Sequence, residues 1–448
     1  MNKSITLTQL EDFEKDFNRD PAKRVAQLAV TMNGVNQSAT DPFTARRDRF
    51  QFSVELKTGH ITNQKGSGRC WMFAALNTMR VEVMKKLNLE DFELSQNYLL
   101  FYDKLEKSNY FLESILETLD EPTNGRVIAH LLGAPLNDGG QWDMLCNLVD
   151  KYGVVPKDAM PETACSSSTW EVTSYMTRKL REFACTLRTG YSEGKTVEQL
   201  RGMKETMLCA IYNMLSIAFG NPPKTFTFEA RDKDKKFIRD VNMTGRGFYE
   251  KYIGWELSDY VSLINATTAD KPFHRTFTVK FLGNVKEGRP VKYLNLPVED
   301  LKRAAIRQMQ DGAPVWFGCD VGKSSTRKTG IMDLMALRPD QLFGVEFGMD
   351  KAQRLDYGDS LMTHAMVFQG VNLDEEGRPN RWRVENSWGE EPGEKGYYVM
   401  SDDWFDEYMY QIVVNKKYLS EEQLAEYESE PILLEPWDPM GSLAVVRG

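Results

Sequence analysis

The 448-residue sequence has no long apolar run, and its opening residues are polar. No stretch approaches the roughly 20 consecutive apolar residues that a helix needs to cross a membrane. The residues after Met1 lead directly into the polar stretch 9–20, so the apolar centre of a secretory signal is also missing. These absences predict a protein that neither spans a membrane nor is secreted.

Cysteine is sparse and scattered, and no two cysteines form a C-x-x-C pair. The six are Cys70, Cys146, Cys165, Cys185, Cys209 and Cys319. Secreted domains that depend on disulfides carry denser cysteine patterns than this. Together with the missing signal, the pattern predicts free thiols in a reducing cytoplasm.

Histidine is rare, and positive charge is not in excess. The four histidines are His60, His130, His274 and His364, and none has a His or Cys partner at metal-ligand spacing, so no metal is expected. Gly318 and Gly322 enclose three residues where a phosphate loop needs four, so no nucleotide cofactor is expected either. The net charge of −9 argues against nonspecific nucleic-acid binding by the whole molecule, although a local basic patch is compatible with it.

A candidate nucleophile, Cys70, follows a glycine-rich loop. The loop runs from Gln64 to Arg69, and residues 70–84 contain no Gly or Pro and place apolar side chains at helical spacing. The positive end of a helix dipole beside the sulfur would lower the pKa of the thiol. Gln64, six residues upstream, is placed to donate its amide to an oxyanion. Alone, Cys70 is more typical of a small buried side chain; the loop is what favours catalysis.

A thiolate nucleophile needs a base, and the base needs a group that orients it. His364 lies in the apolar run 362–371, which is predicted to be a buried strand. A second strand-like run closes on Asn386-Ser387-Trp388-Gly389. The amide oxygen of Asn386 can accept the imidazole N–H, and the indole of Trp388 can shield that bond from water. Singly these are a core histidine and turn residues, but in the order Cys, His, Asn they predict a catalytic triad.

These segments resemble the papain-like cysteine peptidases, and more closely their bleomycin hydrolase and bacterial aminopeptidase C branch. The resemblance extends over essentially the whole chain, as far as the tail 435–441. It implies that Cys70 is the nucleophile, His364 the general base and Asn386 the orienting amide. It also implies that Gln64 donates to the oxyanion.

The resemblance further predicts how a substrate is held. Gly139 and Gly140 would line the cleft, although an ordinary turn before a helix explains this pair equally well. Trp388 would also border the substrate. The C-terminal arm would enter the cleft, where a free carboxylate near Ala444 pairs with the α-amino group of a peptide. Val445–Gly448 continue past the usual family end, so they are trimmed, fold aside from the site, crowd it, or are an artificial extension.

The expected fold is α+β, with a papain-like two-lobed core, a large mainly helical insertion and a C-terminal arm. Nucleophile and base are 364 − 70 = 294 residues apart, roughly twice the spacing of minimal family members, so an insertion must separate them. Position 67 is Ser where secreted members carry a disulfide cysteine. The expected parts are an N-terminal segment packing on the core and on other subunits (1–60), a helical lobe with the nucleophile (61–165), the insertion (166–290), a strand-rich lobe with His and Asn (291–416) and the arm (417–448).

The predicted function is a cysteine aminopeptidase that removes N-terminal residues from peptides through a thioester acyl-enzyme. Amide-containing small molecules are a further candidate substrate class. An endopeptidase on the same scaffold is the alternative, and a non-catalytic ring that binds peptide or nucleic acid is less favoured. The resemblance also implies a homohexamer with its active sites facing a central cavity.

Overall fold

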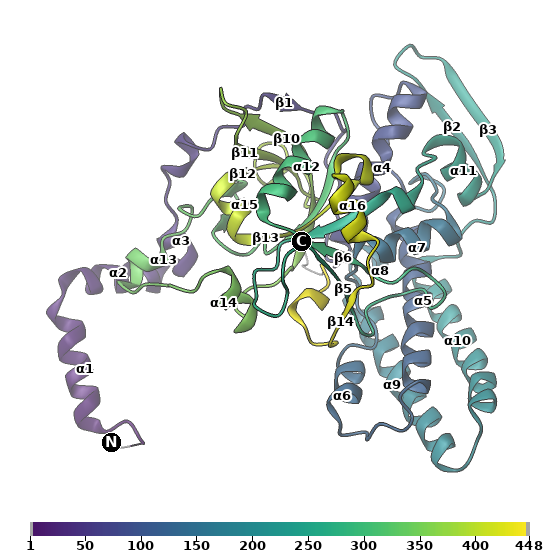
Figure 1. The fold of residues 1–448 in the computed structure, drawn as a ribbon, viewed down its shortest axis with the longest axis horizontal. Coiled ribbons are helices and arrows are strands. Elements are labelled where there is room, and N and C mark those ends of the chain that lie inside the picture. The colour runs from purple at the N-terminus through teal and green to yellow at the C-terminus, as the bar shows by residue number, and fades with distance from the viewer. Residues whose placement is uncertain (1–2, 445–448) are drawn as a thin grey trace.

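A computed structural model describes residues 3–444 of the chain (Figure 1). The long helices α5 (Gln96–Leu116), α9 (Trp170–Ser192) and α10 (Val197–Phe219) gather on one side of a large sheet. The N-terminal helices α1 (Leu7–Arg19) and α2 (Pro21–Asn33) extend away on the other side. Within residues 3–444, no helix is both long enough and apolar enough to cross a membrane.

The large sheet contains twelve strands from the described part of the chain. Their order is β14-β5-β6-β4-β13-β7-β10-β11-β12-β9-β8, and β1 pairs with β10. The strands are β1 (Val54–Glu55), β4 (Tyr260–Ile264), β5 (Arg275–Val279), β6 (Tyr293–Asn295), β7 (Val315–Cys319), β8 (Ser325–Thr326), β9 (Ile331–Met332), β10 (His364–Leu373), β11 (Pro379–Glu385), β12 (Tyr397–Ser401), β13 (Met409–Asn415) and β14 (Ile432–Leu434).

Shorter helices surround the sheet and connect its strands. The α-helices are α3 (Val35–Ala39), α4 (Cys70–Leu87), α6 (Arg126–Gly133), α7 (Trp142–Tyr152), α8 (Ala164–Ser167), α11 (Gly245–Tyr252), α12 (Val298–Gln310), α13 (Pro339–Phe343), α14 (Lys351–Asp356), α15 (Asp402–Tyr408) and α16 (Glu421–Tyr427). Four 3₁₀ turns are η1 (Thr44–Arg46), η2 (Leu257–Asp259), η3 (Lys416–Tyr418) and η4 (Pro439–Gly441), all within residues 3–444.

Helix α4 is a core helix that packs on β7 and β10. Its first ten residues, from Cys70 to Met79, are all buried, as expected for a helix that is apolar around most of its circumference. An ion pair of 2.9 Å joins Arg80 on α4 to Glu385 at the end of β11, and both side chains are fully buried. Because Asn386 follows Glu385 directly, this pair links the helix of the predicted nucleophile to the strand that delivers the orienting amide.

The α+β class predicted from the sequence is confirmed. The predicted insertion differs at its end, because β4 and β5 lie before residue 290 and yet belong to the large sheet. The elements that stand outside this sheet are α9, α10, α11 and the hairpin of β2 (Phe226–Arg231) and β3 (Phe237–Met243). The boundary at 290 is therefore too late, since apolar strands after about residue 260 have already returned to the sheet.

Candidate active site

Cys70 occupies the first position of α4 and is fully buried. The backbone carbonyl of Arg69 accepts the N–H groups of Met72 and Phe73, both at 3.0 Å, and this closes the first turn. No side chain caps the helix. The thiol therefore lies at the end of a helix where backbone N–H groups have no partner within the helix.

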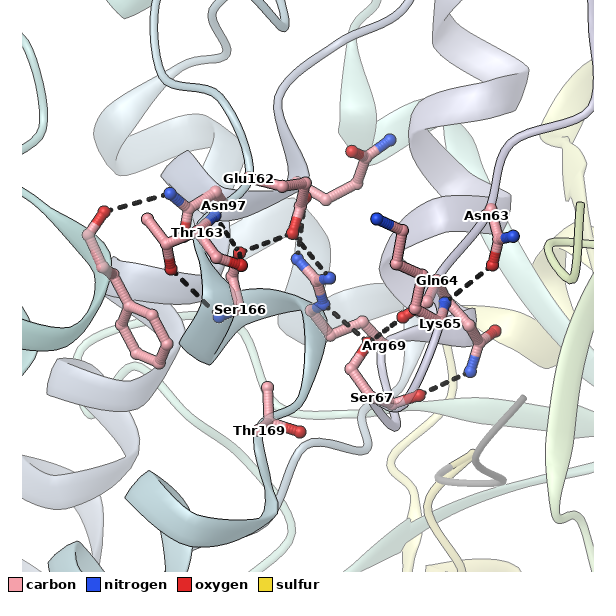
Figure 2. Close-up of polar contacts among 12 residues, drawn as sticks. Asn63, Gln64, Lys65, Ser67, Arg69, Asn97, Glu162, Thr163, Ser166 and Thr169 are labelled. Carbon is pink, nitrogen blue, oxygen red and sulfur yellow. Dashed lines mark hydrogen bonds and ion pairs between the residues drawn. The ribbon is translucent and has the colours of Figure 1, made fainter.

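Side chains from elsewhere in the chain fix the loop before Cys70 (Figure 2). The guanidinium of Arg69 donates to both carboxylate oxygens of Glu162, at 2.9 and 3.1 Å, and to the hydroxyl of Ser67 at 2.9 Å. The N–H of Gly68 donates to the carboxylate of Asp138 at 2.9 Å. The loop is thus tied to the helical lobe at two successive residues.

Gln64 is held against the segment that carries Asn386. Its backbone N–H donates to the carbonyl of Ser387 at 2.8 Å, and its side-chain oxygen accepts from the Ser387 hydroxyl at 2.6 Å. Its amide nitrogen donates to the carbonyl of Ser67 at 2.6 Å (Figure 2). These contacts give the carboxamide of Gln64 a fixed orientation in the loop that leads to Cys70.

His364 and Asn386 form the predicted imidazole–amide pair. His364 is the first residue of β10, and its Nε2 lies 2.9 Å from Oδ1 of Asn386. Because an amide oxygen only accepts, Nε2 carries the proton and Nδ1 keeps its lone pair. Nδ1 is buried and has no hydrogen-bond partner within residues 3–444. The ring therefore presents a proton-accepting nitrogen to the interior.

Cys70 and His364 lie on two elements that pack together, α4 and β10. The N–H of Ala365, the residue after His364, hydrogen-bonds the sulfur of Cys70. Trp388 covers the imidazole, with ring centroids 4.8 Å apart and planes inclined by 32°. The shielding role predicted for this indole therefore agrees with the packing.

Burial sets the protonation of both groups. It raises the pKa of Cys70 to about 12, although the N–H groups of Ala365, Trp71 and Cys70 itself oppose the rise. Burial also lowers the pKa of His364 to about 4. The hydrogen bond that His364 donates to Asn386 opposes this shift, and the positive charge of Arg327 adds to it. The expectation that the helix end lowers the thiol pKa is wrong for this closed site, because removal of the thiolate from water outweighs the dipole. Thiol and imidazole are both neutral at rest.

Gly140 lies where the arm and the nucleophile helix meet. Ala444 forms an antiparallel bridge with Gly140. A Cβ atom added at Gly140 would lie 2.6 Å from the indole of Trp71, so only glycine fits between the ring and the arm. The carbonyl of the neighbouring Gly139 accepts from Nζ of Lys107 at 2.6 Å. The close approach explains why position 140 is glycine, and the cleft role of this pair stays a prediction.

The C-terminal arm is anchored along its path to this point. Asp438 forms a 2.7 Å ion pair with Lys271, and the carbonyl of Met440 accepts from the hydroxyl of Tyr293 at 3.1 Å. Ser442 donates its hydroxyl to the carbonyl of Met362 and accepts from Gln141 at 2.7 Å through its own carbonyl. Ala444 is fully buried. Val445–Gly448, where the sequence departs from the family end, lie outside the described residues.

Sequence reasoning missed a group of buried charges beside Gly139 and Trp71. Asp138 pairs with Lys104 at 2.5 Å, and Asp103 pairs with Lys107 at 2.7 Å. Three of the four, Asp103, Lys104 and Lys107, lie on α5. The carbonyl of Asp138 also accepts from the indole nitrogen of Trp71 at 2.6 Å. The i,i+4 spacing of Asp103 and Lys107 was visible in the sequence, but it is usual on exposed helices too, so only packing reveals its place.

Similarity to known proteins agrees with this geometry. A model of the peptidase C1-like family matches residues 4–441. The chain belongs to this family. Its peptidase C1-like relatives include aminopeptidase C of Listeria monocytogenes serovar 1/2a, which is 49% identical over 445 residues, 99% of this chain and 100% of the relative. Bleomycin hydrolase of Gallus gallus is 46% identical over 403 residues, 88% of each chain.

A solved structure of the same family matches over its full length. The crystal structure of PepW from Lactobacillus rhamnosis HN001 superposes with a TM-score of 0.97 at 49% identity and covers 99% of this chain and 100% of that one. The resemblance inferred from the Cys70, His364 and Asn386 segments is thereby confirmed, as is the papain-like fold.

Proposed function

We propose that Cys70, His364, Asn386 and Gln64 carry the activity of this chain, which is a cysteine aminopeptidase. The supporting observation is the buried imidazole of His364, whose Nε2 is held by Asn386 and whose Nδ1 has no hydrogen-bond partner within residues 3–444, on the strand against which the helix of Cys70 packs. Each group has one role in peptide hydrolysis, and the groups converge from two lobes of the fold.

The reaction begins from the neutral pair. Nδ1 of His364 accepts the thiol proton as Sγ of Cys70 attacks the carbonyl carbon of the first peptide bond. The amide of Gln64 and the N–H at the start of α4 stabilise the oxyanion. His364 then protonates the departing amine, which leaves a thioester on Cys70. A water molecule, deprotonated by His364, hydrolyses the thioester and releases the first residue.

The arm supports exopeptidase over endopeptidase action. Its Ala444 pairs with Gly140, and we infer that the arm thereby fills one end of the substrate cleft, so that a long substrate cannot extend in that direction. We assign the free carboxylate that binds the substrate α-ammonium to a chain end near Ala444. For that carboxylate to form, water must hydrolyse the peptide bond that follows Ala444, which releases Val445–Gly448.

We also propose a cytoplasmic location and a homohexameric assembly. All six cysteines are free, which is compatible with the cytoplasm. A homohexamer with inward-facing sites would keep folded proteins away from the thiol. Helices α1 and α2 have no buried residue and expose large apolar side chains, so they are suitable contact surfaces.

Trapping the acyl-enzyme tests the chemistry. Rapid acid quench of the protein with an aminoacyl ester should add one aminoacyl mass to the peptide that contains Cys70. Cys70→Ala should carry no adduct, whereas Cys185→Ala, which removes an exposed thiol of the insertion, should still be acylated at Cys70. An adduct that persists in Cys70→Ala would contradict the assignment.

A further inference from the structure

A cationic side chain, Arg327, is stacked on the indole that packs on His364, and it lies on a loop to which the mechanism above gives no role. Arg327 lies between β8 and β9. Its carbonyl accepts from the hydroxyl of Tyr398 at 3.3 Å, and the carbonyl of the next residue, Lys328, accepts from the N–H of Gly393 at 3.2 Å. The backbone that carries the arginine is therefore fixed to the strand-rich lobe.

The guanidinium of Arg327 lies over Trp388, with Cζ 4.6 Å from the ring centroid. The same indole packs on His364, so the cation and the imidazole share one aromatic neighbour. The charge of Arg327 contributes to the lowered pKa of His364. This arginine therefore lies close enough to His364 for its charge to act on the imidazole.

Arg327 is exposed, and no carboxylate within residues 3–444 forms an ion pair with it. By contrast, Arg69 and Arg80 near the same site are paired with Glu162 and Glu385. Stacking on an aromatic face leaves the in-plane N–H groups of a guanidinium available, and their geometry matches a carboxylate.

The position of the arm decides which part of a substrate meets this cation. The arm contacts Gly140, Gln141 and Met362. Trp388 instead contacts His364, Tyr398 and Arg327. If the arm fills the side of the amino terminus, the leaving part of the peptide must lie on the other side, next to the general acid His364 and along Trp388.

We infer that Arg327 binds a carboxylate on the leaving residue, so that the preferred substrates are dipeptides or peptides with an acidic residue in second place. The inference rests on the proposed aminopeptidase function. In a dipeptide the carboxylate is the C-terminus of the leaving amino acid; in a longer peptide it is an Asp or Glu side chain.

Four substrates distinguish a C-terminal carboxylate from a side-chain carboxylate as the group that Arg327 binds. Their first residue, X, is the one released fastest from a panel of aminoacyl arylamides, and the pairs are X-Ala against X-Ala-NH₂ and X-Asp-NH₂ against X-Asn-NH₂. The intact chain should favour the carboxylate member of a pair by about tenfold in kcat/KM, mainly through KM, as expected for a charge-assisted contact. Preference in the first pair identifies the C-terminus, and preference in the second identifies the side chain.

Arg327→Gln should reduce that preference to near one. Lys328→Gln is the matched control, because it removes the same charge one residue away without the stack on Trp388, and it should keep the preference. Arg327→Lys should retain part of it, since a point charge remains without the planar fork.

Three results would overturn the inference. One is an absence of carboxylate preference in the intact chain, and another is an equal preference before and after Arg327→Gln. The third is an equal loss of kcat/KM on all four substrates in Arg327→Gln, because that would show that the arginine only holds Trp388 in place. If the intact chain releases X from none of the arylamides or peptides, the proposed function itself fails.

Discussion

Cys70 and His364 are buried in the same interior, and burial moves their pKa values apart, to about 12 and about 4. Between about pH 4 and about pH 12 the thiol of Cys70 keeps its proton and the imidazole of His364 carries no extra proton, so both groups are uncharged. The site thus holds a neutral proton donor, the thiol of Cys70, and a neutral proton acceptor, Nδ1 of His364. We expect charge to develop only when a substrate carbonyl and the oxyanion donors are present. At Cys70, the cost of removing the thiolate from water therefore outweighs the stabilisation of the thiolate by the helix dipole.

The pH dependence of activity follows from His364. Its pKa lies below the ordinary value of 6.5, so the proton-accepting form persists as the pH falls below 6.5 and is lost only through about pH 4. We expect kcat/KM for an aminoacyl arylamide to decline on the acid side with a midpoint near 4. A pH–rate profile with its acid limb centred near 6.5 would show that the imidazole is solvated in the working enzyme.

Gln64 offers a separate test of transition-state stabilisation. Gln64→Ala should lower kcat by about 10² to 10³ with little change in KM, because an oxyanion donor acts on charge that develops in the transition state. The control is Gln199→Ala, which removes a glutamine of the α10 capping box in the insertion and should leave kcat unchanged. Equal rates for Gln64→Ala and the intact chain would remove Gln64 from the mechanism.

At the scale of elements, α5 supports the cleft from below. Asp138 accepts from Lys104, from the N–H of Gly68 and from the hydroxyl of Thr169. These contacts hold its pKa well below 3.8 despite burial. One carboxylate therefore ties α5, the nucleophile loop and the start of α9 together.

Asp138→Asn should lower the free energy of unfolding by about 3–5 kcal/mol, because it leaves Lys104 buried without its partner. Since the folded-state pKa is depressed, the contribution of Asp138 is present above 3.8 and is lost as the pH falls below that value. Urea unfolding of both proteins at pH 7 and at pH 3 measures this, with exposed Asp12→Asn as the control. If Asp138→Asn lowers the free energy of unfolding as much at pH 3 as at pH 7, Asp138 is not ionised in the folded protein.

Much of this architecture could be predicted from the sequence, and each part that could not be predicted has its own physical reason. Cys70, His364 and Asn386 lie in short motifs whose chemistry depends on residue type and order, so they could be recognised without a structure. The buried pair of Arg80 and Glu385 could not, because the two residues are 305 positions apart and each is ordinary in its own segment. The end of the insertion was misplaced because β4 to β6 are only three to five residues long, too short for clear periodicity.

At the scale of the whole molecule, the N-terminal helices extend from the body without covering their apolar side chains (Figure 1). Exposed large apolar residues include Leu7, Leu10, Phe13, Val25, Leu28 and Met32. An isolated chain would leave this surface in water, which favours contact with another copy.

If the chain forms the proposed homohexamer, sedimentation velocity should show a species of about six times the 51.4 kDa chain mass. The double substitution Leu10→Asp and Phe13→Asp should shift the protein to smaller species while far-UV circular dichroism stays unchanged. Leu433→Asp, which changes an exposed apolar residue on β14, is the control and should keep the large species. A monomer for the unsubstituted chain under assay conditions would exclude the ring.

The central claim is that Cys70 chemistry is confined to peptide amino termini by the arm. The most direct measurement compares initial rates on an aminoacyl arylamide and on its N-acetyl form, for the intact chain and for a chain lacking Met440–Gly448. We predict that the intact chain, after any trimming of Val445–Gly448, hydrolyses only the free-amino form. Truncation should shift the rate ratio toward the N-acetyl form by about tenfold or more, since it removes both the block and the carboxylate at the end of the arm. An unchanged preference for the free amino group after truncation would contradict the account.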